Sequence, residues 1–598
     1  MKKKVFAFLL AVLMLLSVVG CAKKAAEPVV EATKEPVVTA APTAAPTPEP
    51  TPEPKPEPTE AVILFTNDVH CGVDDEIGYV GLARIKAALE AANKTVILVD
   101  CGDAVQGDVI GTLSKGEAII ELMNDVGYDV AVIGNHDFDY GMEQFNKNIS
   151  LAKYQYVCCN FLNDKGEAVL KPYTIIEAVG KKIAFIGIDT PESFTKSTPV
   201  YFQDAEGNFI FSFCEENEGK DLYDKVQETV DAVRAEGADY VIALAHLGVD
   251  YQSSPWTASE VIENTTGIDA VLDGHSHTDF KVEYDKDFVS VKNKDGNEVI
   301  HSSTGTKLHN VGMLTLTPAE DKINASVKLI DASAMAFMDE VGVLAEDNGM
   351  GDVVKAALAK NEELVNTVVA HTDVDLVIKD PVTGERIVRS QETNLGDLCA
   401  DAYRAMGGTE IAFVNGGGVR DVIPAGDITY GQIIKVHPFG NALCTVEATG
   451  QEILDALEFS VCSLPGESGG FLHVSGLKFT VDLNVDSTVV KDSKKQFVEV
   501  AGERRVTDVE VLQEDGTYAP LDPEKTYTLA CHNYLLKDKG DGYTMFADNN
   551  FLTEDVMLDN QVLINYIVEK LGGTVGAEYG DPYGEGRITI IDKAAAAE

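Results

Sequence analysis

Positive charge is scarce in this chain of 598 residues. Lys and Arg together number 48 against 97 Asp and Glu, which gives a formal net charge of −49. A field of that sign repels the phosphates of DNA, RNA and anionic lipid headgroups. Long nucleic acid is therefore not expected as a partner, whereas a small phosphate compound stays compatible because bound cations reverse the local sign inside a cleft.

The cysteine spacing gives no sign of disulfide cross-links or of a zinc site. The chain has ten cysteines and no CxxC spacing, and setting Cys21 aside leaves an odd number. Neither a disulfide framework nor a zinc-ribbon site is predicted. Cys71 and Cys101 lie beside the motifs described below, and we interpret them as small core residues.

Long apolar runs are absent except at the N-terminus. Lysines there precede an apolar run from Val5 to Val19, which is typical of an export signal. The sequence Val18-Val19-Gly20-Cys21 resembles the lipobox of bacterial lipoproteins, which implies cleavage before Cys21 and acylation of its thiol. An ordinary cleaved signal with an accidental cysteine is the alternative. No later segment has the roughly 20 apolar residues needed to span a bilayer.

Composition divides the chain into segments. Residues 1–21 form the predicted signal peptide, and residues 22–60, dominated by Pro, Ala, Thr, Glu and Val, cannot bury a core. Proline-rich chain extends about 3.1 Å per residue, so this segment reaches on the order of 100 Å. We interpret it as a wall-spanning spacer, with a disordered tail of no function as the alternative. The rest is predicted to form a first domain at 61–335, a helical linker at 336–368 and a second domain at 369–592.

Short apolar runs rich in β-branched residues alternate with helical patterns after residue 60. The runs AVILF, TVILV, DVAVI, KIAFIGI, YVIALA and DAVL predict buried strands. Leu222, Val226 and Val230, spaced by four residues, predict a helix with one apolar stripe. Such alternation indicates an α/β fold, and the β patterns VGMLTLTP and ASVKLID are expected to close the sheet. The segment from Asp339 to Val368 is predicted to be one long amphipathic helix.

Potential metal ligands follow nearly every apolar run of the first domain. They are Asp68 and His70 in DVH, Asp103 in GDAVQGD, Asn135 in GNHDFD, His246 in AHLG, and His275 and His277 in GHSH. The carboxyl ends of strands in an open α/β sheet converge on one crevice, so we expect these side chains to meet. Imidazole nitrogens with carboxylate and amide oxygens suit zinc, manganese, iron or cobalt, and this many groups suffice for two ions.

In that order, these motifs resemble those of the calcineurin-like metallophosphoesterases. NGGGVR, HPFGN and KGDGY resemble the C-terminal domain of the 5′-nucleotidase family, which includes bacterial UDP-sugar hydrolases. The resemblance covers about residues 61 to 590. It implies a two-domain α/β fold, with an N-terminal four-layer metallophosphoesterase β-sandwich flanked by helices and a smaller α/β C-terminal substrate-binding domain.

The resemblance also implies a role for each matching residue of the first domain. Asp68, His70 and His277 hold one divalent ion, Asn135, His246 and His275 hold the other, and Asp103 bridges both. Manganese, zinc and cobalt are all compatible. His136 faces the phosphate and stabilises or protonates charge on the leaving oxygen, and Asp139 orients its ring. The family more often has Glu where this chain has Asp137.

In the second domain, the resemblance implies a set of substrate contacts. These are Arg386 and Arg389 as a basic cluster for phosphate or specificity, Asn415 and Arg420 for base and phosphate, Phe439 and Tyr534 as rings that sandwich the base, and Asp541 for the ribose hydroxyls. Tyr534 replaces the commoner Phe, and some relatives have an additional arginine where this chain has Gln391. Because metal and base contacts lie on different domains, we expect the domains to close over the substrate.

The predicted protein is therefore a metal-dependent 5′-nucleotidase that hydrolyses small nucleotides. Nucleoside di- and triphosphates or UDP-sugars are further candidate substrates. A 2′,3′-cyclic-nucleotide 2′-phosphodiesterase with 3′-nucleotidase activity is the alternative within the class, and a non-catalytic surface protein that binds nucleotides is the alternative outside it. The expected location is the extracellular face of the cell membrane, through the lipid on Cys21 alone, with release or cell-wall association as variants. Oligomeric state is left open.

Overall fold

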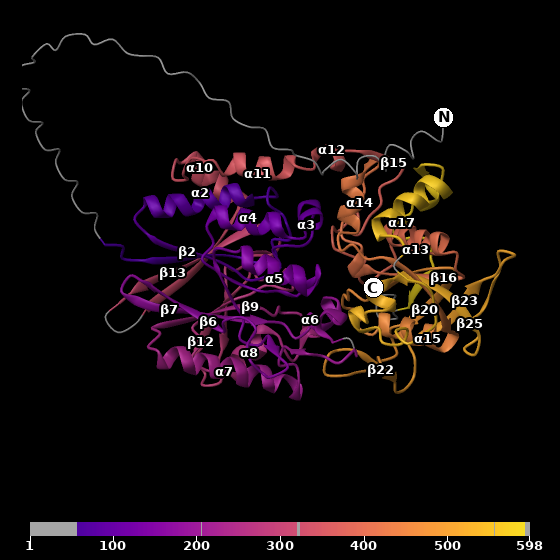
Figure 1. Ribbon diagram of the computed structural model, residues 1–598, viewed down its shortest axis with the longest axis horizontal. Coiled ribbons are helices and arrows are strands. Elements are labelled where there is room, and N and C mark those ends of the chain that lie inside the picture. The colour runs from indigo at the N-terminus through magenta and orange to yellow at the C-terminus, as the bar shows by residue number, and fades with distance from the viewer. Residues whose placement is uncertain (1–56, 205, 320–322, 555, 592–598) are drawn as a thin grey trace, which may run out of the picture. The chain divides into compact units, whose positions relative to one another are not determined.

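The computed structural model describes residues 57–204, 206–319, 323–554 and 556–591, and these ranges belong to one compact unit (Figure 1). The predicted signal peptide, the predicted acylation site Cys21 and residues 22–56 of the predicted spacer lie outside the described residues. Within the described part of the chain, no helix combines the length and the apolarity needed to cross a membrane.

The first sheet is built on the strand that opens the first domain. Its order is β14 (Ile323–Asp331), β13 (Asn310–Pro318), β1 (Ala61–Thr66), β2 (Thr95–Asp100), β3 (Val130–Val132) and β4 (Gln155–Val157). The strands from β1 to β4 are parallel, and β13 closes the other side of β1 in antiparallel register, with Ile63 opposite Leu314. The predicted closure of the sheet by residues 311–318 and 325–331 is confirmed.

The second sheet has the same mixed character. Its order is β11 (Val289–Lys292), β12 (Glu298–Ser302), β10 (Ala270–Leu272), β9 (Tyr240–His246), β7 (Lys181–Asp189) and β6 (Tyr173–Ala178). β9 is buried along its whole length, as expected for a central parallel strand with both faces covered.

Apolar side chains fill the space between the two sheets. Ile63 and Val99 of the first sheet share one buried cluster with Phe185 and Leu244 of the second. The outer face of the first sheet is covered by α2 (Gly78–Ala91) and α4 (Glu117–Val126), and that of the second by α7 (Lys220–Ala235) and α8 (Ala258–Asn264). Figure 1 shows the two helical layers on opposite sides of the strands. The predicted four-layer sandwich is confirmed.

The segment that joins the domains differs from the prediction. Instead of one long helix it forms α10 (Ala332–Glu340), α11 (Met350–Ala359) and α12 (Glu362–Val365). Gly342 and Gly349 have left-handed backbones, with φ of 70° and 103°. Asp347 Oδ1 accepts a hydrogen bond from the Gly349 backbone nitrogen at 3.0 Å, which forms a turn in place of a helical bond. The prediction was wrong because local turn chemistry outweighs the apolar periodicity here.

The second domain is an α/β unit with several small sheets. The largest has the order β19 (Leu472–Ser475), β16 (Ile411–Asn415), β25 (Thr526–His532), β18 (Leu443–Thr449) and β26 (Phe551–Thr553). Another has the order β24 (Tyr518–Pro520), β23 (Val506–Leu512), β20 (Leu477–Asp482) and β28 (Ile588–Ile591), and a third joins β17 (Gly426–Thr429), β15 (Val368–Thr372) and β27 (Thr574–Val575).

Helices of the second domain begin at clear sequence signals. α13 spans Asn394–Gly407, α14 spans Tyr430–Val436 and α15 spans Gly450–Ser460. Thr429 and Thr449 each cap a helix by accepting a hydrogen bond from the third backbone nitrogen, whose own side chain bonds back to the cap. Each cap stabilises its helix by roughly 1 kcal/mol.

Candidate metal centre and substrate pocket

The strand ends of the first domain bring the predicted metal ligands together. Asp68 follows β1, Asp103 follows β2, Asn135 follows β3, His246 closes β9, and His275 and His277 follow β10. Asp68, Asp103 and His246 are buried. Strands from both sheets therefore supply ligands at one edge of the sandwich, as the sequence predicts.

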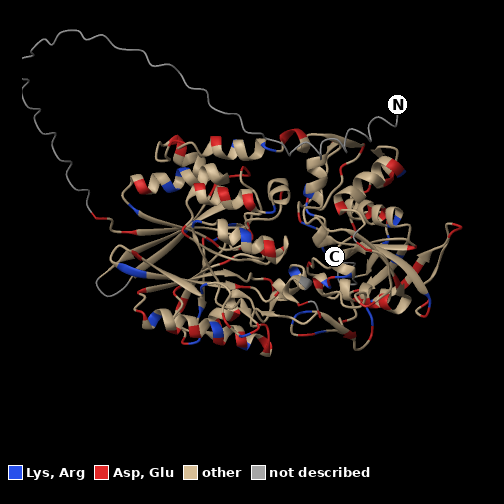
Figure 2. Cartoon of the chain, viewed as in Figure 1, with Lys and Arg blue, Asp and Glu red and all other residues tan. Residues whose placement is uncertain are grey.

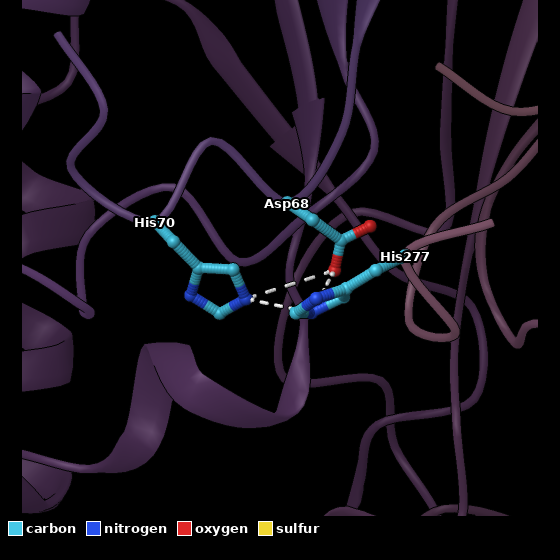
Figure 3. A group of neighbouring side chains, drawn as sticks. All are labelled: Asp68, His70 and His277. Atoms are coloured by element: carbon cyan, nitrogen blue, oxygen red, sulfur yellow. Dashed lines mark hydrogen bonds and ion pairs between the residues drawn. The ribbon is translucent and has the colours of Figure 1, made fainter. Parts of the chain in front are cut away.

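Asp68, His70 and His277 point toward one another (Figure 3). His70 Nε2 lies 3.0 Å from His277 Nε2, and Asp68 Oδ1 lies 3.4 Å from His277 Nε2. His70 Nδ1 donates to the backbone oxygen of Gln106 at 2.9 Å, which leaves the Nε2 lone pair free for a ligand. Two imidazole nitrogens and a carboxylate oxygen this close together are ligand types that bind divalent metals, so the group fits one.

Asp68, Asp103 and His246 form a second group of mutually close ligand atoms. His246 Nδ1 donates to the backbone oxygen of Cys101 at 2.8 Å, and its Nε2 lies 3.0 Å from Asp103 Oδ2. That buried Nε2 has no hydrogen-bond partner among the described residues. Leaving such a nitrogen unsatisfied costs about 1–3 kcal/mol, which a bound cation removes. Because Asp68 belongs to both groups, the bridging role of Asp103 stays a prediction.

Asn135 and His275 complete the set on the side of the second group. Asn135 Oδ1 lies 2.9 Å from His275 Nδ1, and the backbone nitrogen of His275 donates to Asp68 Oδ2 at 3.0 Å. The other ring nitrogen of His275, Nε2, lies 3.0 Å from Oε2 of Glu192, a residue outside the predicted set. All of the predicted ligands are thus within one connected cluster.

Five of the predicted ligands have left-handed backbones, as do other residues elsewhere in the chain. Left-handed φ values of 48°, 44°, 59°, 76° and 56° occur at Asp68, His70, Asp103, His275 and His277, respectively. Such conformations cost side-chain-bearing residues on the order of 1–3 kcal/mol each and cluster at functional sites. These predicted ligands lie in sharp turns directly after strands, and the packing of the surrounding sheets maintains the strained backbone.

The buried carboxylates of the cluster have opposite electrostatic environments. Burial raises the pKa of Asp68 to about 7, and the neighbouring Asp103 adds to the rise. Burial would also raise the pKa of Asp103, but His246 and His136 outweigh it and hold that pKa well below its usual range. A divalent cation favours the ionised form of both groups.

His136 and Asp139 form the predicted dyad. His136 lies on η1 (Asn135–Phe138), and its Nδ1 is 2.6 Å from Asp139 Oδ2. Ser197 Oγ donates to the other carboxylate oxygen of Asp139 at 3.2 Å. Burial lowers the pKa of His136, but Asp139 and Asp103 raise it more, so the pKa lies above its ordinary value. This arrangement favours a protonated imidazole, as a general acid requires.

One cavity is lined by residues of both domains. The first domain contributes Asp103, Asn135, His136, Asp139, His275 and His277 to its wall. The second contributes every predicted substrate residue, namely Arg386, Arg389, Asn415, Arg420, Phe439, Tyr534 and Asp541. Residues 386 and 541 are far apart in sequence, and the fold of the second domain brings them to the same wall.

Acidic residues predominate over the chain (Figure 2). In this cavity, by contrast, three arginine side chains lie in the wall. Arg386 Nε donates to Glu467 Oε2 at 2.8 Å, and Arg420 lies over the Phe439 ring, 5.6 Å from its centroid. Arg389 is half-buried, and its Nε has no hydrogen-bond partner among the described residues. Burial and the charges of Arg386 and Arg420 lower the pKa of Arg389, so an anion there would be strongly stabilised.

The predicted base and ribose contacts lie in the same cavity. The Phe439 ring is 5.7 Å from the His136 ring, with an angle of 31° between their planes. Tyr534 donates from its hydroxyl to the Thr195 backbone oxygen at 2.6 Å. Asn415 Nδ2 donates to Asp541 Oδ2 at 2.6 Å. The sandwich of a base between Phe439 and Tyr534 stays a prediction.

Family models match both halves of the chain. The model for calcineurin-like phosphoesterases matches residues 61–279, and the model for the 5′-nucleotidase C-terminal domain matches residues 368–548. The chain belongs to the 5′-nucleotidase family. With this ligand set and these two domains, it is a metal-dependent phosphoester hydrolase.

Several known 5′-nucleotidases and related proteins are similar to the chain. The trifunctional nucleotide phosphoesterase YfkN of Bacillus subtilis is 27% identical over 89% of this chain, which spans only 35% of that longer protein. A 5′-nucleotidase of Vibrio cholerae is 27% identical, over 84% of this chain and 89% of its own length. The crystal structure of a 5′-nucleotidase precursor from Thermus thermophilus covers 89% of this chain at 26% identity, with a TM-score of 0.71 and all of its own chain matched.

Several polar residues of the cavity wall in this 5′-nucleotidase family member are not predicted from the sequence, among them Glu192 and Lys196. Glu192 contacts His275, and Lys196 Nζ lies 3.3 Å from Asp541 Oδ1. Both lie at α6 (Ser193–Lys196), whose N-cap is Glu192, just after the end of β7. The rule that polar residues after apolar strands meet at one edge applies to KIAFIGID as well, and it would have pointed to this loop.

Proposed function

We propose that the chain releases inorganic phosphate from nucleoside 5′-phosphates, with nucleoside di- and triphosphates or UDP-sugars as further substrates. The observation that carries the proposal is the shared cavity. His136, Arg389 and Phe439 line the same space, so an acid, an anion-binding group and a flat apolar ring are available to one ligand. A nucleotide is the small phosphate ester that uses all of them.

Residues of the second domain hold the two ends of the substrate in this proposal. Arg386, Arg389 and Arg420 bind phosphate oxygens, and Asp541 accepts hydrogen bonds from ribose hydroxyls. Phe439 and Tyr534 stack against the base, and because every base has a π-face, base selectivity is modest. The contacts come from the domain that does not hold the metal ligands, so domain closure, with residues 336–368 as the hinge region, is part of the proposal.

Residues of the first domain perform the bond cleavage. His136 gives a proton to the ribose oxygen that leaves, and the carboxylate of Asp139 holds its ring through Nδ1 at 2.6 Å. The residues that would hold two cations are Asp68, His70, Asp103, Asn135, His246, His275 and His277. When bound, divalent cations such as manganese, zinc or cobalt neutralise phosphoryl charge and supply a nucleophile at neutral pH.

We place this activity outside the cell, at the membrane surface. The support is the predicted export signal and the predicted lipid anchor at Cys21, followed by the proline-rich spacer of residues 22–60. Nucleotide scavenging at that surface needs no other membrane contact.

Phosphate release by the full-length chain tests the proposal. AMP, ATP, UDP-glucose and 2′,3′-cyclic AMP are offered with manganese, zinc or cobalt, against EDTA. We expect metal-dependent release with AMP among the good substrates. In Phe439→Ala, stacking loss of about 1–3 kcal/mol should raise KM for AMP, while hydrolysis of p-nitrophenyl phosphate, which has no nucleobase, changes little. Tyr518→Ala is the matched control, because Tyr518 is an exposed aromatic residue of the second domain that lies outside the cavity wall and outside the hinge region.

Failure to release phosphate from any nucleotide with any of these metals would refute the nucleotidase proposal. Cleavage of 2′,3′-cyclic AMP in preference to AMP would instead favour the cyclic phosphodiesterase. The similarity to YfkN, which is named a trifunctional nucleotide phosphoesterase, is compatible with either activity.

A further inference from the structure

Glu192 is a buried acid that the catalytic scheme above does not use. It is 5% exposed and precedes α6 at the edge of the cavity. A buried carboxylate is costly unless hydrogen-bond donors surround it. Its oxygen Oε2 has two such partners, His275 Nε2 at 3.0 Å and Ser253 Oγ at 2.6 Å.

The contact with Glu192 determines which nitrogen of His275 carries the proton. An ionised carboxylate only accepts hydrogen bonds, so Nε2 must be the donor. A neutral imidazole has one N–H, and Nδ1 is then left with a free lone pair. That Nδ1 lies 2.9 Å from Asn135 Oδ1, which is also an acceptor. Two acceptors this close together repel each other, and a cation bound by both would remove that repulsion.

Ser253 and the β7 loop hold Glu192 in place. Ser253 is 4% exposed and lies on η4 (Tyr251–Ser253), after β9. Glu192 follows β7, the neighbouring strand of the same sheet. Glu192, Ser253 and His275 thus come from the loops after β7, β9 and β10, respectively. Their hydrogen bonds connect the ends of three strands of the second sheet.

From this geometry we propose that Glu192 is a positioning residue that fixes the Nε2–H tautomer of His275 and directs its Nδ1 to a metal ion. Ser253 supports it as a second donor to the same oxygen. The inference rests on the dinuclear centre of the proposed function, but not on the identity of the substrate. Carboxylate partners of metal-binding histidines commonly change metal affinity by about 10- to 100-fold.

Metal binding in the absence of substrate tests the inference. Cobalt is titrated into the metal-free full-length chain by calorimetry, and the visible absorption of the bound ion reports its ligand geometry. Wild type should bind two ions. In Glu192→Gln, which keeps the size of the side chain, one site should weaken by about 10- to 100-fold with an altered spectrum while the other keeps its affinity. Ser253→Ala should weaken the same site by about fivefold.

The 15N chemical shifts of the histidine ring nitrogens report the tautomer directly. They would not change if Glu192 only stabilised the fold. In the metal-free chain, the His275 signals, identified by their loss in His275→Ala, should show Nε2 protonated, and Glu192→Gln should shift them toward a mixture of tautomers. Glu215→Gln is the matched control. Glu215 is equally buried at 5%, pairs with Lys494 at 2.9 Å and lies outside the cavity wall.

Wild-type affinity at both sites in Glu192→Gln would overturn the inference, even if wild type binds two ions and releases phosphate. An equal loss in Glu215→Gln would also overturn it, because the effect would then come from disturbed packing. If Glu192→Gln fails to fold, unchanged cobalt affinity in Ser253→Ala has the same consequence. Wild type that binds fewer than two ions would refute the dinuclear centre itself, and this inference with it.

Discussion

The surroundings of His136 suit its proposed role as a general acid. It contacts Asp139 through one ring nitrogen, and its backbone nitrogen donates to Asp103 Oδ1 at 2.8 Å. The same peptide segment thus carries the predicted metal ligand Asn135 and, directly after it, the proposed acid His136. If both roles hold, we expect phosphate ester cleavage and metal binding to be coupled through these two adjacent residues.

Replacing His136 by Ala should lower kcat by about 10²- to 10⁴-fold, because a positioned acid contributes that much to departure of a poor leaving group. Cobalt affinity should stay close to wild type, since its ring is outside the predicted ligand set. Steady-state phosphate release together with calorimetry separates the two effects. A variant with wild-type turnover of AMP would show that the leaving oxygen is protonated by another group.

Asp559 provides a second prediction at the scale of single residues, one that concerns stability. It is 1% exposed at the first turn of α17 (Asp559–Asn565), and burial raises its pKa from 3.8 to about 8. At a pH between these two pKa values, Asp559 keeps its proton in the folded chain and has lost it in the unfolded chain. Its contribution to stability therefore falls as pH rises from about 4 to about 8.

Asp559→Asn, which keeps the acceptor for the Asn560 backbone nitrogen, should therefore melt above wild type at pH 9 and close to it at pH 4. Thermal unfolding across this pH range checks the sign. A difference between the proteins that shrinks with rising pH would contradict the raised pKa.

At the scale of elements, the turn between β21 (Val489–Lys491) and β22 (Phe497–Val500) of the second domain reaches the first. Lys494 Nζ lies 2.9 Å from Glu215 Oε1 and 5.4 Å from the ring centroids of Phe194 and Phe209. Asp492 Oδ1 accepts from the Lys494 backbone nitrogen at 2.9 Å, which shapes the turn. The ammonium group is thus held over aromatic faces beside a buried carboxylate.

Lys494→Ala should destabilise the protein by about 1–3 kcal/mol, because Glu215 is left buried without its cation. Glu215→Gln should remove most of that penalty in the double variant. Urea unfolding of the single and double variants measures the coupling between the two side chains. Strict additivity of the two substitutions would mean that the ion pair contributes nothing.

At the scale of the whole molecule, strong negative charge coexists with a cationic pocket. The net charge of −49 belongs to the chain, yet Arg386, Arg389 and Arg420 line the cavity. Buried Asp68 and Asp103 lie beside them within the ligand cluster. Divalent cations are the groups that would neutralise these carboxylates without filling the space that a phosphate needs.

Chelation should therefore affect stability as well as activity. Ligands that bind only the folded state add about 2.7 kcal/mol at a hundredfold excess over Kd, so EDTA should lower Tm and manganese should restore it. His246→Ala, which lacks one nitrogen of the cluster, should show a smaller difference. Identical melting of the wild type with and without chelator would argue against tightly held ions.

Much of this architecture could be predicted from the sequence. The apolar runs at β1, β2, β3, β7, β9 and β10 identify buried strands because β-branched residues in short runs have few other stable environments. The polar residues directly after those runs predict candidate ligands, since strand ends meet at one edge, and the structure brings these side chains together. The prediction of one long helix between the domains was wrong, because Gly342, Asp347 and Gly349 form turns that interrupt the apolar pattern.

By itself, the sequence determined the fold class, because that depends on periodicity along the chain. It predicted the candidate ligands from their places after strands, and the candidate substrate residues from local motifs that resemble the family. Only the tertiary structure decided that Glu192 contacts His275, that Lys494 pairs with Glu215, and that the guanidinium groups share a wall with His136. These contacts join loops far apart in sequence. No local pattern specifies them, since their distances depend on how sheets, turns and domains pack together.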